Sequence, residues 1–171
     1  MRMKSLVTFS LMVALCASLQ RTMAQTPDAK TAFNKVIENY LGVKDALSAG
    51  NGPQASAHAK DLLESIDAVP AARLTDNQRK IWSAYLPKLE FDSRHISEVD
   101  KVPHQREHFT SLSANLFTVL KAIPVNQSVL YEESCTMTKG TFLSASSSGK
   151  DPYTGMDNCS KVNATIPATK Q

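Results

Sequence analysis

The sequence predicts a mainly α protein: an antiparallel four-helix bundle over about 27–124, followed by a small irregular or short-stranded β region over about 125–171. Apolar residues recur at helical spacing in four blocks, and short turn signals separate these blocks. The spacing stops at Pro124, after which serine, threonine, glycine and proline become frequent. Amphipathic helices with short connections favour an antiparallel bundle. Residues 25–171 have the length of a single domain.

Residues 1–24 have the pattern of a secretory signal peptide. Two basic residues near the start precede an apolar core, residues 6–19, that is too short to span a bilayer comfortably. The small residue Ala24 provides a cleavage site, so Gln25 would begin the mature chain. We therefore expect a secreted, periplasmic protein. No later apolar run has the length of a transmembrane helix.

The first predicted helix begins at a Thr26 cap with Pro27 in its first position, and the turn Ser48–Pro53 ends it. A second helix is predicted from about Gln54 to Asp67. The residues that these two helices direct inward are Phe33, Val36, Ile37, Tyr40, Leu41, Leu47, Ala55, Ala59, Leu62, Leu63 and Ile66.

Thr75 and Gln78 have the spacing of a capping box at the start of a third helix. Asp100 is the predicted cap of a fourth helix, with Pro103 in its first turn. The apolar stripe of both helices predicts core packing rather than a cofactor site, and Trp82 belongs to it. The inward residues are Ile81, Trp82, Tyr85, Leu89, Ile96, Val99, Phe109, Leu112, Leu116, Leu120 and Ile123.

Three short strands are predicted in the tail, at 128–134, 140–144 and 161–166. The serine-rich run between the second and third strands contains glycine, proline and aspartate, which favour turns. The tail is therefore expected to be a small β region that docks on the bundle.

The charge balance argues against nucleic-acid binding. The whole chain has 19 basic and 16 acidic residues, and removal of residues 1–24 leaves 16 of each. No basic stripe with interleaved aromatic residues follows. A neutral mature chain also lacks the electric field that binding to an anionic membrane surface needs.

All the sulfur of the predicted mature chain lies in one window. Cys135, Met137, Met156 and Cys159 are its only cysteines and methionines. Thiolate and thioether are soft donors, and soft donors select Cu(I) among the common biological ions. In an extended segment Cys135 and Met137 point to the same side, and Met156 and Cys159 can converge in a turn. The window therefore predicts a soft-metal site formed by two Cys/Met pairs.

A disulfide between Cys135 and Cys159 is the alternative interpretation. A secreted chain with two cysteines often forms one. Such a bond would stabilise the fold by about 3–4 kcal/mol on the chain-entropy model. In that case the protein would be a structural or partner-binding module without a metal.

Three histidines are further candidate metal ligands. His104 and His108 are four residues apart and share one helix face, and His95 lies near the end of the preceding helix. No catalytic motif accompanies them, and no spacing pairs a histidine with Cys135 as nucleophile and base. We therefore expect no enzyme activity.

Several motifs resemble those of one family. Asn39–Asn51 is similar to its Y-L-x-L-K-D-A-L helix, and His104–Lys121 is similar to its R-E-x-F-x-x-L-S helix. In the tail, the family typically runs Y-x-x-x-C-P-M, K-G-A-Y-W-L-S, N-P-Y-x-G and M-x-x-C-G. Here Thr136, Phe142, Asp151 and Ser160 replace Pro, Trp, Asn and Gly, and both cysteines and both methionines remain.

The chain thus resembles domain-of-unknown-function family 3347, which occurs in secreted bacterial proteins and in HlyD-type adaptors of copper and heavy-metal efflux systems. The resemblance implies a periplasmic role in metal homeostasis. Together with the sulfur window, it leads us to expect a module that binds Cu(I) in metal homeostasis or efflux, with an efflux adaptor as its partner. Tyr131, Phe142 and Tyr153 would provide an apolar shell around the ligands.

Overall fold

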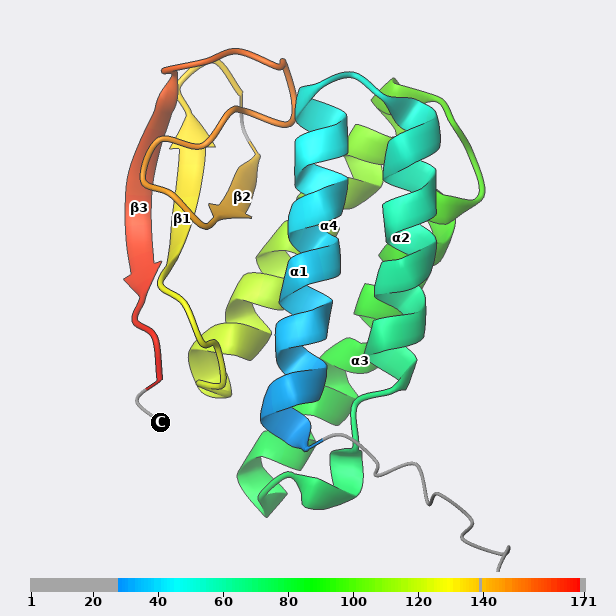
Figure 1. The fold of residues 1–171 in the computed structure, drawn as a ribbon, viewed down its shortest axis with the longest axis vertical. Coiled ribbons are helices and arrows are strands. Elements are labelled where there is room, and N and C mark those ends of the chain that lie inside the picture. The colour runs from blue at the N-terminus through cyan, green and yellow to red at the C-terminus, as the bar shows by residue number, and fades with distance from the viewer. Residues whose placement is uncertain (1–27, 139, 170–171) are drawn as a thin grey trace, which may run out of the picture.

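The computed structural model describes residues 28–138 and 140–169, which form a bundle of long helices with a small sheet beside it (Figure 1). The mainly α prediction is confirmed. The predicted signal peptide and the Thr26–Pro27 helix start lie outside the described residues.

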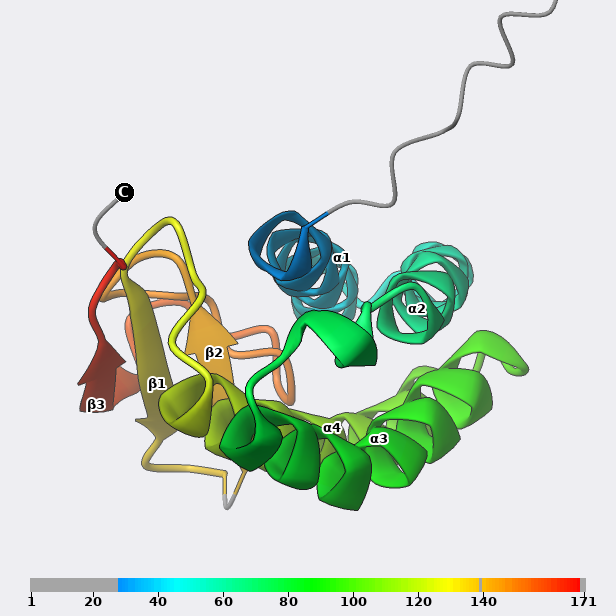
Figure 2. The same cartoon turned by 90° about the horizontal axis from the view of Figure 1, so that it is seen from below.

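The bundle consists of α1 (Ala29–Ser48), α2 (Gly52–Asp67), α3 (Asp76–Ser97) and α4 (Val102–Ala122). A short 3-10 turn, η1 (Ala71–Arg73), connects α2 to α3. Viewed along the helices, α1 and α2 lie on one side and α3 and α4 on the other (Figure 2). Within residues 28–138 and 140–169, no helix combines the length and the apolar character that crossing a membrane requires.

The helix starts follow local capping chemistry. Asp28 accepts a hydrogen bond from the Thr31 amide at 2.8 Å and caps α1. Asn51 does the same for the Gln54 amide at 3.1 Å, so α2 begins two residues before the predicted Gln54. The predicted capping box at Thr75 is confirmed at α3.

The predicted Asp100 cap of α4 is wrong. The cap position is Lys101, and no side chain caps it, although Pro103 lies in the first turn as predicted. The connection from α3 is held instead by the buried Gln105 amide, whose nitrogen lies 2.6 Å from the Val99 carbonyl oxygen and 3.0 Å from that of Gly52. The start of α4 therefore has no side-chain cap, and the Gln105 side chain from inside the helix satisfies carbonyl oxygens of the neighbouring turns instead.

The core lies where the four apolar stripes meet. Trp82 is 1% exposed and packs edge-on against Phe33, with ring centroids 5.0 Å apart. Tyr40 stacks on Phe109 at 5.2 Å. Trp82 is thus a core residue, as the helical spacing predicted. Of the other predicted inward residues, Leu41, Leu63, Ile81, Tyr85 and Val99 are only partly buried.

The tail forms the antiparallel sheet β2–β1–β3, from β1 (Leu130–Cys135), β2 (Thr141–Ser144) and β3 (Ser160–Ile166). All three predicted strands are confirmed within one or two residues. The sheet stands beside α1 and α4, with β2 nearest the helices (Figures 1 and 2).

Polar contacts dock this sheet on the bundle. The Leu143 amide of β2 donates to the buried Tyr40 hydroxyl of α1 at 3.0 Å, and that hydroxyl also lies 2.7 Å from the Ser113 hydroxyl of α4. Burial raises the pKa of Tyr40 well above its usual range. The neutral phenol therefore links two helices and a strand.

Candidate metal centre

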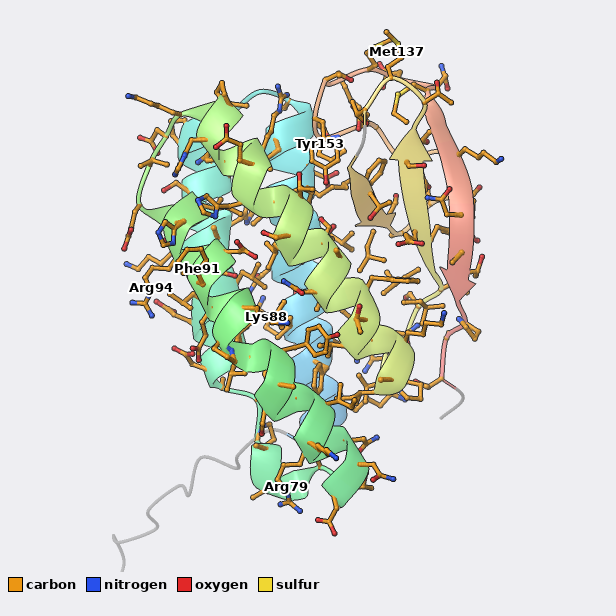
Figure 3. All side chains as sticks on the ribbon, turned by 180° about the vertical axis from the view of Figure 1, so that it is seen from behind. Arg79, Lys88, Phe91, Arg94, Met137 and Tyr153 are labelled. Carbon is orange, nitrogen blue, oxygen red and sulfur yellow. A yellow bond between two sulfur atoms is a disulfide. The ribbon has the colours of Figure 1, made fainter. Side chains whose placement is uncertain are left out.

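The predicted ligands fall into two separate groups. The sulfur cluster, Cys135 and Cys159 with Met137 and Met156 beside them, lies at one end of the sheet. The histidine cluster, His95, His104 and His108, lies between α3 and α4. Figure 3 shows Met137 at the end of the sheet and Phe91 on α3, far apart in the view. The structure does not bring the histidines to the sulfur atoms.

Strand pairing places the two cysteines together. Cys135 is the last residue of β1 and pairs with Ser160, the first residue of β3, so the chain delivers Cys159 next to Cys135. Their Cα atoms are 5.0 Å apart, and the two sulfur atoms form a disulfide. This is one of the two states that the sequence left open. Cys135 is 1% exposed, whereas Cys159 is partly exposed.

Asp151 is a site residue that the sequence reasoning missed. One ligand atom each from Cys135, Asp151 and Cys159 can be chosen so that all lie within 4.8 Å of one another. Asp151 is fully buried, and its Oδ2 accepts a hydrogen bond from the Thr154 amide at 2.9 Å. Its Oδ1 is also buried but has no hydrogen-bond partner in the described part of the chain. An unpartnered carboxylate oxygen of this kind suits a cation.

The sequence held one signal for Asp151, which is its position in a motif. The residue occupies the position where the resembled motif has asparagine, and the sequence analysis treated it only as a departure. The turn Asp151–Gly155 is closed by the Gly155 amide, which donates to the Asp151 carbonyl oxygen at 2.8 Å. The Asp151 amide in turn donates to the Met156 carbonyl oxygen at 3.1 Å. These bonds fold the loop so that the carboxylate faces inward.

Both methionines flank the cysteines at the surface. Met137 lies in the turn after β1, which the Thr138 amide closes by donating to the Cys135 carbonyl oxygen at 3.1 Å. The Met137 side chain is 70% exposed and that of Met156 is 40% exposed. Their exposure leaves the thioethers free to move relative to the fixed cysteines.

Arg106 of α4 anchors the loop that carries Asp151. Its guanidinium donates to the Pro152 carbonyl oxygen at 2.7 Å and to the Leu47 carbonyl oxygen at 3.0 Å. Burial lowers the pKa of Arg106, and the Asp151 carboxylate opposes that shift. The loop is therefore held by a charged side chain of the bundle.

The aromatic residues expected around the ligands dock the tail. Tyr153 lies against Phe109 of α4 and Phe142 of β2, with ring centroids 6.1 and 6.5 Å away, and Figure 3 shows it beside α4. Its hydroxyl donates to the Thr141 carbonyl oxygen at 2.7 Å, and burial raises its pKa to about 12. Gly140 is needed here, because a Cβ would come within 2.4 Å of the Tyr153 ring. The predicted shell around the metal stays a prediction for Tyr131, Phe142 and Tyr153.

The histidine cluster is a chain of neighbouring rings. His108 lies between the other two, with centroid distances of 4.7 Å to His95 and 4.8 Å to His104. Its Nδ1 lies 3.2 Å from Oδ1 of the buried Asp92. Phe91 covers one side, 4.1 Å from the His95 ring.

The molecule is thus a helical-bundle protein with a small disulfide-bonded β tail. It belongs to the family described as Protein of unknown function (DUF3347), whose sequence profile matches residues 36–128. The match covers most of the bundle and ends before β1, so the sulfur cluster lies outside it. Neither a curated protein nor a solved structure matches the chain.

Proposed function

We propose that the reduced protein binds Cu(I) as its cargo at the sulfur cluster, in a periplasmic pathway of metal homeostasis or efflux, and that it is not an enzyme. The observation that carries the proposal is the convergence of Cys135, Cys159 and a carboxylate oxygen of Asp151, a buried residue whose Oδ1 has no hydrogen-bond partner in the described residues. Both methionines of the predicted mature chain lie within three residues of a cysteine. The donors required for a soft ion are therefore close together in the sequence on both sides of the disulfide.

The disulfide form of this site cannot bind the ion through thiolates, because its sulfur atoms are bonded to each other. Reduction by a dithiol breaks the S–S bond: two electrons and two protons pass to the cysteines, and the dithiol becomes a disulfide. Deprotonation of both thiols would place two thiolates beside the buried Asp151 carboxylate. Like charges so close repel one another, which a bound cation relieves. The same repulsion favours reoxidation when no metal is present.

The donor types favour Cu(I) over Zn(II). Zinc takes thiolate, imidazole or carboxylate, so Asp151 with two cysteines would suit it. Thioethers instead favour Cu(I), which prefers few soft ligands. We assign Cys135 and Cys159 as ligands, with Met137 and Met156 completing the set. Asp151 then contributes a negative charge close to the ion.

Competition experiments test the metal and its ligands. The reduced protein should take Cu(I) from a chelator and should bind Zn(II) far more weakly. The double substitution Met137→Leu with Met156→Leu should weaken Cu(I) binding and leave the fold intact, because leucine conserves apolar volume. Asp151→Asn is the matched test of the carboxylate. If it abolishes Zn(II) binding while the methionine variant binds Cu(I) like the native protein, the site is a zinc site.

Thiol alkylation tests whether metal and disulfide exclude each other. Cu(I) should protect Cys135 and Cys159 from oxidation, so the loaded protein should form the disulfide far more slowly than the metal-free protein. Mass spectrometry after alkylation counts the free thiols. Equal oxidation rates would show that the metal does not bind these cysteines and would leave the disulfide with a purely structural role.

The proposed partner is an efflux adaptor that accepts the ion. The surface exposure of Met137 and Met156 supports such a transfer, because an acceptor can reach the thioethers before it displaces the buried Cys135. Cells that lack the protein should then be more sensitive to copper, and a gene copy with both cysteines replaced by serine should not restore resistance. Full restoration by that copy would contradict a role for the sulfur cluster.

A further inference from the structure

The histidine cluster has an arrangement that the sulfur cluster does not explain. His95 comes from the end of α3, and His104 and His108 come from successive turns at the start of α4; His108 has both other rings within 5 Å of its own. Imidazole nitrogens are borderline donors that suit Zn(II), Cu(II) and Ni(II). The cluster therefore offers a different chemistry from thiolates and thioethers.

Hydrogen bonds at Nδ1 define which ring nitrogen of His95 and of His108 is free to bind a metal ion. The Nδ1 of His95 lies 2.8 Å from the Phe91 carbonyl oxygen, which can only accept, so Nδ1 carries the proton. The Nδ1 of His108 is held in the same way by the Asp92 carboxylate. The Nδ1 of His104 faces a Glu107 carboxylate oxygen at 3.7 Å. In His95 and His108 Nε2 is therefore left with an open lone pair, whereas the 3.7 Å contact of His104 is too long to fix its tautomer.

This pattern is the one that metal-binding histidines show. A ligating histidine usually donates its other ring N–H to a carboxylate or a backbone carbonyl, which fixes the tautomer and makes the free nitrogen a better donor. Here one carboxylate and one carbonyl act in this way on two of the three neighbouring rings, His108 and His95. Asp92 is 4% exposed, so its role toward His108 is held in place by the packing of α3 against α4.

We propose that His95, His104 and His108 form a second metal site, which binds a divalent first-row ion through their Nε2 atoms. Cu(II) should bind most tightly, because it stands highest in the affinity order for nitrogen ligands. Among the His, Cys, Asp and Glu side chains of the described residues, Cys135, Asp151 and Cys159 form the group whose ligand atoms already lie close enough together to hold an ion. The His104 ring must therefore rotate to join an ion at His95 and His108, and its side chain, which is 44% exposed, has room to do so.

The site does not depend on the proposed Cu(I) function, and the disulfide permits a clean test. The full chain, without a histidine tag and with its disulfide intact, offers no thiolates from Cys135 and Cys159. Cu(II) and Ni(II) added as simple salts should then bind with one-to-one stoichiometry in a competition titration. The electron paramagnetic resonance spectrum of the Cu(II) form should show coupling to several nitrogens.

Single substitutions define the ligands. Asp92→Asn removes the hydrogen-bond partner of a ligand and should weaken Cu(II) binding by about 10–100-fold. His104→Gln and His95→Gln each remove a ligand itself and should weaken Cu(II) binding by more than that. His58→Gln is the matched control, because His58 is the fourth histidine and lies on α2 against Gly42 of α1. It should bind both ions like the native protein.

Circular dichroism must show that each variant is folded. His108→Gln can fail to fold because the buried Asp92 carboxylate loses its hydrogen-bond partner. In that case the variant at the exposed His104, His104→Gln, still tests the metal site. Affinity unchanged in both His104→Gln and His95→Gln would overturn the proposal. A Cu(II) spectrum without nitrogen coupling from side chains, or an equal loss in His58→Gln, would overturn it as well.

Discussion

The bundle and the β tail are held together by different forces. The bundle buries large apolar side chains such as Trp82, Phe33 and Leu116, and most of it lies within the matched family profile. The tail has short strands, a disulfide, and a loop held by Arg106 and by hydrogen bonds. Apolar burial tolerates movement of surface groups, whereas a loop held by a few polar bonds depends on each one. A ligand site built on such a loop can respond to redox state without disturbing the core.

The largest expected effect comes from a cavity in the bundle. Trp82→Ala should cost about 3–5 kcal/mol of unfolding free energy, because the buried indole packs against Phe33 and leaves a void. The tail should unfold with the bundle, since β2 depends on Tyr40 of α1. Because Trp82 is the single tryptophan of the chain, denaturant titration followed by circular dichroism measures the loss. Phe91→Ala on the same helix is the control: its side chain is 54% exposed, so it should change stability by less than about 0.5 kcal/mol.

Loss of the disulfide should affect the tail more than the bundle. Cys135→Ser with Cys159→Ser removes a bond that links residues 24 apart in the sequence, which the chain-entropy model rates at about 3–4 kcal/mol. Hydrogen exchange should rise in β1, β3 and the Asp151 loop, while α2 and α3 keep their protection. An equal rise in every helix would show that tail and bundle unfold as one unit, and the contrast between the two regions would then be wrong.

A smaller loss should follow when the bond between the two regions is cut. Tyr40→Phe leaves the Leu143 amide without its acceptor and should cost about 1–3 kcal/mol. Tyr131→Phe is the control, because the Tyr131 hydroxyl makes no hydrogen bond within residues 28–138 and 140–169 and the residue is only partly buried. Equal losses in the two variants, measured by denaturant titration, would remove Tyr40 as the link.

The bundle was predictable because its signals are local. Helical spacing, the Thr75 capping box and the stop at Pro124 each act within a few residues, and the inward position of Trp82 follows from its stripe. The Asp100 cap failed, and the turn is held by Gln105, several residues along, which donates to the Val99 carbonyl oxygen. A competing contact through space is invisible to a rule that considers four consecutive residues.

The site was predictable only in part for the same reason. The strand register that aligns Cys135 with Ser160 brings the cysteines together, and the clustering of sulfur in the sequence hinted at it. The separation of the histidines from the sulfur cluster had no local signal, and the signal for Asp151 was only its place in a motif. Asp151 turns inward because Arg106, from another element, holds the following residue, and His108 turns toward α3 because Asp92 is there.

The smallest expected effect is a dependence on alkaline pH at the docking surface. Burial raises the pKa of Tyr153 to about 12, whereas the pKa of a tyrosine in the unfolded chain is about 10. Because the folded pKa is the higher one, the contribution to stability is complete below about pH 10 and is lost as the pH rises toward 12. At about pH 10.5 the loss should be less than about 1 kcal/mol.

Tyr153→Phe cannot ionise, so it should lack this part of the decline, although it also loses the bond to the Thr141 carbonyl oxygen. The readout is therefore the change in unfolding free energy between about pH 8 and 10.5, not its absolute value. Identical declines in the two proteins would mean that the Tyr153 hydroxyl is in contact with solvent and that the tail docks on α4 more loosely than its aromatic contacts with Phe109 and Phe142 indicate.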